Sequence, residues 1–262
     1  MDGQLTVALA GDTMLGRGVA AALASSSRPV FGADVVATVR QADVAVLNLE
    51  CCISTRGEPW PDPAKRFFFR APPAAADALA DLGASCVTLA NNHALDFGGE
   101  ALLDTLEHLA EAGIEAVGAG PDLDRARRPV VLEADGFGVV GVTDHPAEYA
   151  ATSATPGVAF AALDRGVPEW LLEEVSGLQA DARRLCLLET GAAASHVEHD
   201  VGAPAALVLR HLEAVERDRL DEMRRLPAPP LDRCSEGAVI EGEGGHVRGN
   251  EALHLCEDDE LG

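Results

Sequence analysis

The sequence is poor in basic and aromatic residues and has no long hydrophobic run. Lys and Arg number 20 against 43 Asp and Glu, which gives a formal net charge of -23. A charge of this sign repels phosphate backbones and anionic membrane surfaces at long range, so nucleic-acid binding is disfavoured. No segment reaches the roughly 18 to 20 apolar residues that span a bilayer. We therefore expect a protein with no membrane span.

Several motifs are also missing. The six cysteines are scattered without a CxxC pair, far below the density of a disulfide-stapled domain, so we predict free thiols. The apolar run that follows Gln4 ends at Ala10 and lacks a basic leader, so a cytoplasmic location is expected for the chain as given. The sequence contains no P-loop, dinucleotide fingerprint or GxSxG elbow, which argues against nucleotide-binding and serine-hydrolase folds. Nothing in it indicates an oligomeric state.

Short apolar runs alternate with helical segments in the first two thirds of the chain. The runs predict strands at 5–10, 42–49, 86–90, 114–117, 130–132 and 138–143. Apolar spacing and helix formers predict helices at 18–24, 34–41, 74–82 and 98–112. The hydrophobic content of 47% suffices for a sizeable core. This alternation predicts an α/β fold built on a layered sheet.

The pattern changes after about Asp181. A charged helix is plausible at 207–225, but no apolar run resembles the earlier strands, and the PAPP segment at 227–230 breaks the chain. Residues 233–262 are rich in Gly and Glu, as in solvated acidic tails. We predict one domain at 5–181 and a divergent, weakly structured acidic region at 182–262.

Three of the predicted strands end in side chains that can ligate a metal ion. They are Asp12, then Asn48 and Glu50, then Asn91, Asn92 and His93. In an open α/β sheet, ligands bind beyond the carboxyl ends of the strands, where these side chains would converge. Carboxylate, amide and imidazole donors suit a divalent cation such as Mn, Mg, Zn or Fe(II). His93 could act beside it as general acid, oriented by Asp96.

Each of these residues also has a structural interpretation. A Gly-Asp pair after a strand is often a turn or a helix cap, and an Asn-Asn-His run can be a capping loop. Asp96 could cap the helix that begins near Gly98 instead of orienting His93. The joint occurrence at three strand ends nevertheless favours a functional site.

Three further segments are weaker candidates. The cations and aromatic rings of residues 65–70 (KRFFFR) could receive an anionic substrate, although an aromatic core strand is favoured. Asp144, His145 and Pro146 could supply a ligand, although a turn is favoured. The cluster Ser195, His196, Glu198 and His199 resembles a metal site, but no predicted strand anchors it.

Four segments in the first half of the chain resemble the CapA family of capsule or poly-gamma-glutamate synthesis proteins. The resemblance rests on VALAGDTMLGRGV, ADVAVLNLECCIST, FFFRAPP and LGASCVTLANNHALDFGGEALLDTLEHLAEAGIEAVGAG, in this order from about residue 5 to 121. It implies a four-layer α/β/β/α sandwich of the metallo-dependent phosphatase type. It also implies that Asp12, Glu50 and Asn92 ligate metal and that His93 is the catalytic acid. Asp96 is the second catalytic candidate, through the orienting role described above. Asn48, Asn91 and Arg70 become candidates for substrate binding.

The sequence departs from the family pattern in two places. Met14 stands where the wider superfamily has a histidine, and the later HWG-like and Gly-His-x-His-like motifs are missing, Gly245–Arg248 (GHVR) being the nearest approach. We hypothesise a divergent or frame-shifted continuation after about Asp181.

Three functions remain open for this sequence. The first is a CapA-like metal-dependent hydrolase or acyl-transfer enzyme acting on an anionic polymer or phosphoester. The second is a degenerate, non-catalytic relative that binds an anionic envelope polymer or partner proteins. The third is a structural domain whose polar strand ends are caps.

Overall fold

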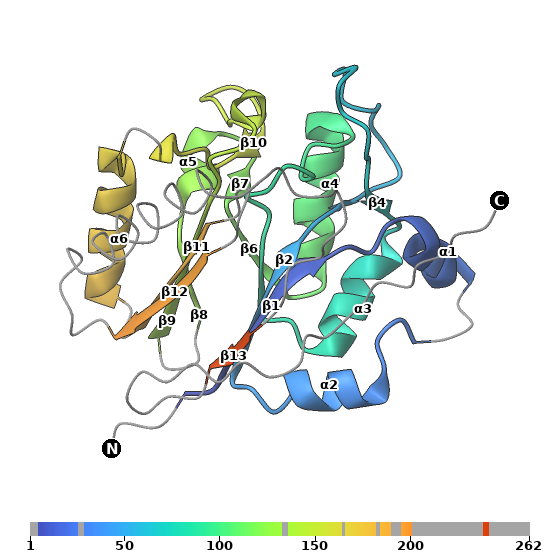
Figure 1. Cartoon of the computed structure of the whole chain (residues 1–262), viewed down its shortest axis with the longest axis horizontal. Helices are drawn as coiled ribbons and strands as arrows, with labels where there is room; N and C mark the ends of the chain where they lie inside the picture. Colours follow the sequence, from blue (N-terminus) through green and yellow to red (C-terminus); the bar gives the residue numbers. More distant parts are fainter. Residues whose placement is uncertain are drawn as a thin grey trace, which may run out of the picture.

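The computed structural model describes residues 5–25, 29–132, 136–163, 166–181, 184–189, 195–200 and 238–240 (Figure 1). It is a mixed α/β structure in which strands and helices alternate along the chain, as the sequence predicts. The first sheet has the strand order β13-β1-β2-β5-β6. These strands are β13 (Ala238–Ile240), β1 (Val7–Thr13), β2 (Val44–Leu49), β5 (Cys86–Thr88) and β6 (Glu115–Val117).

The strands β1, β2, β5 and β6 run parallel, so their carboxyl ends lie at one edge of the sheet. Strand β13 joins β1 antiparallel on the other side. Helices α1 (Arg17–Ser25), α2 (Ala33–Val39), α3 (Ala74–Leu82) and α4 (Gly98–Glu111) connect these strands. The strand pair β3 (Cys52–Ile53) and β4 (Arg70–Ala71) lies beside α4 and α1. Parallel strands require such crossovers, and the helices cover the sheet.

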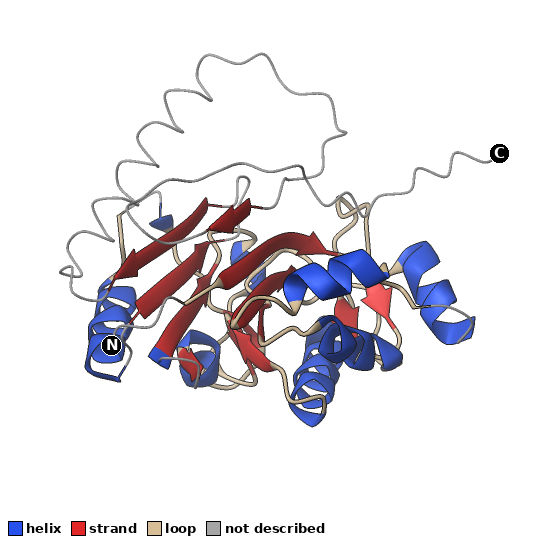
Figure 2. Ribbon diagram, turned by 90° about the horizontal axis from the view of Figure 1, so that it is seen from below, coloured by secondary structure: helices blue, strands red, loops and turns tan. Residues whose placement is uncertain are grey.

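A second sheet lies beside the first. Its strand order is β12-β11-β9-β8, with β12 (Ser195–Asp200), β11 (Arg184–Glu189), β9 (Phe137–Val142) and β8 (Val130–Leu132). Helix α6 (Glu169–Asp181) precedes β11, and α5 (Leu123–Arg127) precedes β8. The pair β7 (Ala119–Gly120) and β10 (Gly157–Val158), with the 3-10 helix η2 (Ala147–Tyr149), lies near α5. Figure 2 shows the strands of both sheets in the middle of the molecule, with helices on either side.

The side chains of β2 explain why its sequence is a continuous apolar run. Every residue of β2 is buried. Val44 and Val46 pack in a core that also contains Phe137 and Val139 of the second sheet. The alternate residues, from Ala45 to Leu49, pack instead with the helices α3 and α4. A strand that is apolar on both faces is therefore buried between a sheet and a helical layer.

The same alternation places β9 between two cores. Phe137 and Val139 face the first sheet, whereas Val140 and Val142 pack with Leu171 and other residues of α6. In the part of the chain that the structure describes, no helix is long and apolar enough to cross a membrane.

The expectation of no strand beyond Asp181 was wrong for residues 184–189. This segment (RLCLLE) forms β11, which pairs in parallel with β9 along its whole length. Its two charged ends hide the apolar centre from a search for continuous runs. Residues 195–200, which hold the Ser195 to His199 cluster, form β12. The predicted helix at 207–225 and the segment at 245–248 lie outside the described residues, and the proposed boundary at 181 stays a prediction.

Candidate functional site

The carboxyl ends of β1 and β2 bring Asp12, Asn48 and Glu50 together. The sequence predicts Asp12 after its strand, but β1 continues to Thr13, with a register shift between Ala10 and Asp12. This irregularity sets Asp12 opposite Asn48, and such bulges commonly redirect a side chain beside an active site. The Nδ2 group of Asn48 donates to Asp12 Oδ1 at 2.9 Å and to Glu50 Oε2 at 2.7 Å. One amide therefore bridges two carboxylates.

The environment of Glu50 disfavours its charged form. The pKa of Glu50 is raised to about 8, chiefly by burial and then by the negative charge of Asp12, while the hydrogen bond from Asn48 opposes the shift. A buried carboxyl next to a second carboxylate keeps its proton unless a cation compensates the charge. The pair is thus a site where a bound cation would relieve the repulsion between two neighbouring carboxyl groups.

Asn91 extends this network into the next strand end. Its Nδ2 donates to Asn48 Oδ1 and to the carbonyl of Leu49, both at 2.9 Å. Its Oδ1 accepts a hydrogen bond from the backbone N–H of His93 at 3.0 Å. The side chains of Asn48 and Asn91 are buried and engaged with protein partners. These contacts favour a positioning role for both residues rather than the substrate contact predicted from the sequence.

His93 is held by a buried acid. Its Nδ1 lies 2.7 Å from Asp96 Oδ2, and Asp96 is fully buried. Because an ionised carboxylate only accepts hydrogen bonds, His93 Nδ1 carries the proton, and Nε2 is the nitrogen on the Glu50 side, 4.0 Å from Oε1. The ring of Phe69 stacks on the imidazole with centroids 4.1 Å apart. Asp96 therefore contacts His93, as the orienting interpretation predicts.

Lys65 compensates the charge of Asp96. Its Nζ lies 2.8 Å from Asp96 Oδ1 and donates to the carbonyl of Asn92, also at 2.8 Å. The backbone N–H of Phe69 donates to Asp96 Oδ2. Lys65 and Asp96 thus tie the aromatic segment to the loop after β5. A buried ion pair with additional hydrogen bonds of this kind fixes geometry.

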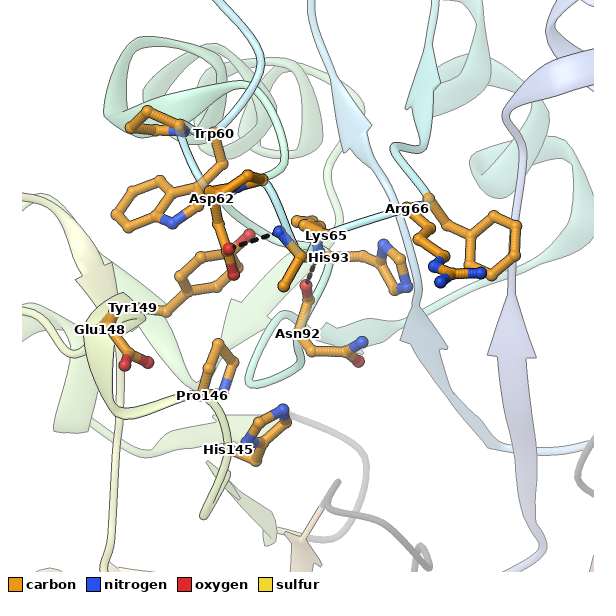
Figure 3. Close-up of a pocket in the computed structure, with 14 residues that line it drawn as sticks. Trp60, Asp62, Lys65, Arg66, Asn92, His93, His145, Pro146, Glu148 and Tyr149 are labelled. Carbon is orange, nitrogen blue, oxygen red and sulfur yellow. Dashed lines mark hydrogen bonds between the residues drawn. The ribbon is translucent and has the colours of Figure 1, made fainter. Parts of the chain in front are cut away.

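A pocket of about 690 Å³ opens beside His93 and Asn92 (Figure 3). Its walls include Trp60, Lys65 and Arg66 from the segment before β4, and His145 and Tyr149 from the segment around η2. Tyr149 packs edge-on against Trp60, with ring centroids 4.7 Å apart. His145, a weaker candidate in the sequence, lies in a bend and lines the pocket. A lone Tyr or Trp carries no sequence signal, so these two residues were missed.

The aromatic segment is not a core strand, and this favoured interpretation was wrong. Only Arg70 of residues 65–70 lies in a strand, and Phe67 is 56% exposed and lines the pocket. Arg70 itself is not among the pocket's lining residues. Its guanidinium group lies over the ring of Phe97, 4.0 Å from the centroid. Lys65 therefore lines the pocket, whereas Arg70, at the other end of the segment, packs on Phe97.

The donor chemistry at the strand ends fits a divalent cation only in part. Within the described ranges, no group of three or more His, Cys, Asp or Glu side chains is arranged to hold a metal ion. Asp12 and Glu50 form a carboxylate pair whose repulsion a cation would relieve, and an amide oxygen of Asn92 would have to complete the set. Met14, which stands where the wider superfamily has a histidine, supplies no imidazole, and its Sδ accepts a hydrogen bond from the backbone N–H of Gly16 at 3.1 Å.

Comparison with known proteins gives one family match. Residues 6–192 match the family described as bacterial capsule synthesis protein PGA_cap. A probable polyglutamine synthesis accessory protein of Mycobacterium tuberculosis is 36% identical over 161 aligned positions, covering 49% of this chain and 42% of that protein. The PGA biosynthesis protein CapA of Bacillus subtilis is 27% identical, covering 60% of this chain and 42% of its own length. The matches thus span about two fifths of these relatives.

Proposed function

We propose, given that this chain belongs to the bacterial capsule synthesis protein family, that it serves poly-gamma-glutamate or capsule synthesis through the site at the ends of β1, β2 and β5. The observation that carries the proposal is the continuous network from Asp12 through Asn48 and Asn91 to His93. This network ends at a pocket large enough for a small ligand or a polymer end.

The strand-end carboxylates would hold a divalent cation. Asp12 and Glu50, with Asn92, are the proposed ligands, and the raised pKa of Glu50 supports a need for positive charge between them. A bound cation would supply charge stabilisation for an oxyanion and activation of a water molecule. Manganese, magnesium, zinc and iron are the candidate cations, because each binds carboxylate or amide oxygen ligands.

His93 is the proposed general acid. Asp96 accepts the hydrogen bond from Nδ1 and fixes the orientation of the ring, so that a proton on Nε2 can reach a leaving group in the pocket. Lys65 holds Asp96 in place and, with Arg66, gives the pocket wall positive charge. The reaction class that fits these groups is hydrolysis or acyl transfer on an anionic polymer or phosphoester.

The wider fold assignment is part of the same proposal. The packing of α3 and α4, the first sheet, the second sheet and α6 in three successive cores supports a four-layer α/β/β/α sandwich of the metallo-dependent phosphatase type. The boundaries predicted from the sequence are a domain at 5–181 and a divergent acidic region at 182–262. Pairing of β11 with β9 argues that the domain reaches at least residue 189.

A non-catalytic relative is the second candidate function. The observation that favours it is the Asn48 amide, which occupies both carboxylates in the space where a cation would bind. In that case the pocket would bind an anionic envelope polymer or a partner protein without transforming it.

Metal content separates the two candidates. The protein is reconstituted with Mn or Zn, desalted and analysed for metal beside an Asp12→Ala/His93→Ala variant. An Asp77→Ala/His108→Ala variant is the matched control, because it carries the same changes on helices α3 and α4 away from the site. Near-stoichiometric metal in the wild type and control but not in the first variant supports the enzyme and justifies phosphoesterase and peptide-ligase assays. Wild-type protein that retains no metal contradicts it and leaves the binding function.

A further inference from the structure

Arg17 has an unusual backbone for its residue type. Its φ is +50°, and it is the one non-glycine residue of the described chain with a positive φ. This left-handed conformation costs about 1 kcal/mol or more for a residue with a Cβ, and glycine adopts it freely. Such outliers concentrate at functional sites, where the surrounding structure holds them. Arg17 begins helix α1, directly after the loop that follows Asp12.

The side chain of Arg17 lies on the aromatic segment of the pocket. Its guanidinium carbon is 4.7 Å from the ring centroid of Phe69 and 5.2 Å from that of Phe67. Phe69 also stacks on His93, so one ring contacts both the cation and the candidate acid. Phe67 lines the pocket and exposes 56% of its surface, although a large aromatic side chain is normally buried. The two rings therefore form a platform that orients the guanidinium group near the pocket.

The guanidinium group keeps its hydrogen-bonding capacity. Over the ranges that the structure describes, no carboxylate lies within ion-pair distance of Arg17, and its side chain makes no hydrogen bond. Arg56, by comparison, pairs with Asp104 and Glu100. A planar guanidinium with five donors that is held by ring contacts alone can receive a carboxylate or phosphate through two parallel hydrogen bonds.

The charge of the whole protein means that an anionic ligand needs local cations at its binding site. The net charge of -23 repels anions from most of the surface. At this pocket Lys65 and Arg66 line the wall, and Arg17 stands beside it on Phe67. Because Lys65 is engaged with Asp96 and with the carbonyl of Asn92, Arg17 and Arg66 are the cations with donors to spare among the described residues here, and Arg17 is the one held on the rings of Phe67 and Phe69.

We propose that Arg17 is a ligand-binding residue of this pocket and that its guanidinium group, seated on Phe67 and Phe69, receives a carboxylate or phosphate oxyanion of the ligand. The proposal rests on the proposed function, because it names a specificity residue of the same site. It does not require a bound metal.

The test uses Arg17→Gly, because glycine relieves the backbone strain while removing the cation. Binding of two probes, inorganic phosphate and the dipeptide γ-glutamyl-glutamate, is measured by calorimetry on the full chain in buffer with a chelator. The thermal midpoint is measured on the same samples. Arg128→Met is the matched control, since it removes an exposed arginine at a separate pocket between α4 and α5.

We expect the wild type to bind at least one probe, and the probe that binds identifies the oxyanion as phosphate or carboxylate. Arg17→Gly should weaken this binding by roughly tenfold or more, since a charge-assisted hydrogen-bonded pair is lost. Its thermal midpoint should stay unchanged or rise. Arg17→Lys, which keeps the charge without the planar fork, should bind with intermediate affinity, and Arg128→Met should bind like the wild type.

Three results would overturn the proposal. They are a wild type that binds neither probe, an Arg17→Gly variant that binds like the wild type, and an Arg17→Gly variant whose thermal midpoint falls, which would make the residue structural. The outcome is distinct from that of the metal experiment. Metal bound at Asp12 with no effect of Arg17→Gly removes this inference alone, whereas Arg17-dependent binding without metal removes the enzyme proposal alone.

Discussion

At the scale of single residues, Glu50 shows how position changes a side chain's chemistry. The sequence shows only an acidic residue after an apolar run. The fold buries it beside Asp12 and gives it the Asn48 amide as partner. Its pKa rises to about 8 from an ordinary value of 4.5, chiefly through burial and then through Asp12. The folded protein therefore holds a proton that the unfolded chain has released at neutral pH.

This difference predicts a pH-dependent stability. Because the pKa of Glu50 is raised on folding, its contribution is fully present below about pH 4.5 and is lost as the pH rises through about 8. We expect the unfolding free energy of the wild type, relative to Glu50→Gln, to fall by on the order of 4 kcal/mol across this window. Urea denaturation at a series of pH values in the presence of a chelator measures it.

A matched variant controls for charge in general. Glu115→Gln changes an exposed glutamate of the edge strand β6 and should follow the wild-type pH profile. If Glu50→Gln shows the same slope as the wild type between pH 4.5 and 8, the proton is not held by Glu50.

Some residues of the candidate site can be predicted from the sequence, and others cannot. Asp12, Glu50 and His93 are visible because each is polar after an apolar run. Arg17, Tyr149 and Trp60 are not, because their roles depend on ring contacts between distant segments. The sequence leaves Asp96 open between a cap and an orienting acid, and the structure shows that it contacts His93 Nδ1, which favours the orienting interpretation.

At the scale of elements, Gly118 fixes how the end of β6 meets the end of β5. Its φ is +78°, and a Cβ added there would lie 2.5 Å from Ala90 Cβ and 3.0 Å from Ala90 N. The residue follows β6 and leads into β7, while Ala90 precedes the Asn91 loop. Close approach of these backbones sets the position of the site's third strand end.

We expect Gly118→Ala to destabilise the protein by about 3 kcal/mol or more, because it combines a positive φ with a backbone clash. Gly113→Ala is the matched control. Gly113 also has a positive φ, of +73°, but a Cβ there meets nothing within 4 Å, so its cost should be about 1 kcal/mol. Chemical denaturation measures the free energy of unfolding of both variants. Equal decreases would show that the contact with Ala90 does not add to the cost of the substitution.

The elements themselves were predicted unevenly. Strand β2 is buried on both faces, so its sequence is a continuous apolar run that predicts a strand. The spacing of the leucines predicts helix α4. Strand β11 was missed because its ends are charged, and its parallel pairing with β9 involves residues more than 40 positions away. The bulge that lengthens β1 through Asp12 has no sequence signature beyond Gly11.

At the scale of the whole molecule, the net charge of -23 opposes compaction. Raising the salt concentration from about 0.01 M to about 1 M shortens the screening length from about 30 Å to about 3 Å. We expect the thermal midpoint at pH 7 to rise with NaCl by a few degrees, since folding concentrates like charges. Near pH 4.5, where the net charge vanishes, the dependence on NaCl should disappear. A midpoint that falls with salt at pH 7 would contradict this.

The sequence by itself determined the α/β class, the order of most strands and helices, the family and three of the polar strand ends. These follow from local patterns, because burial on both faces of a strand and on one face of a helix leaves a period in the chain. Only the tertiary structure decided which polar groups touch, that Asn48 and Asn91 hold the network, and that Arg17 lies on Phe67 and Phe69. Such contacts join segments tens of residues apart, and no local pattern records a distance across a fold.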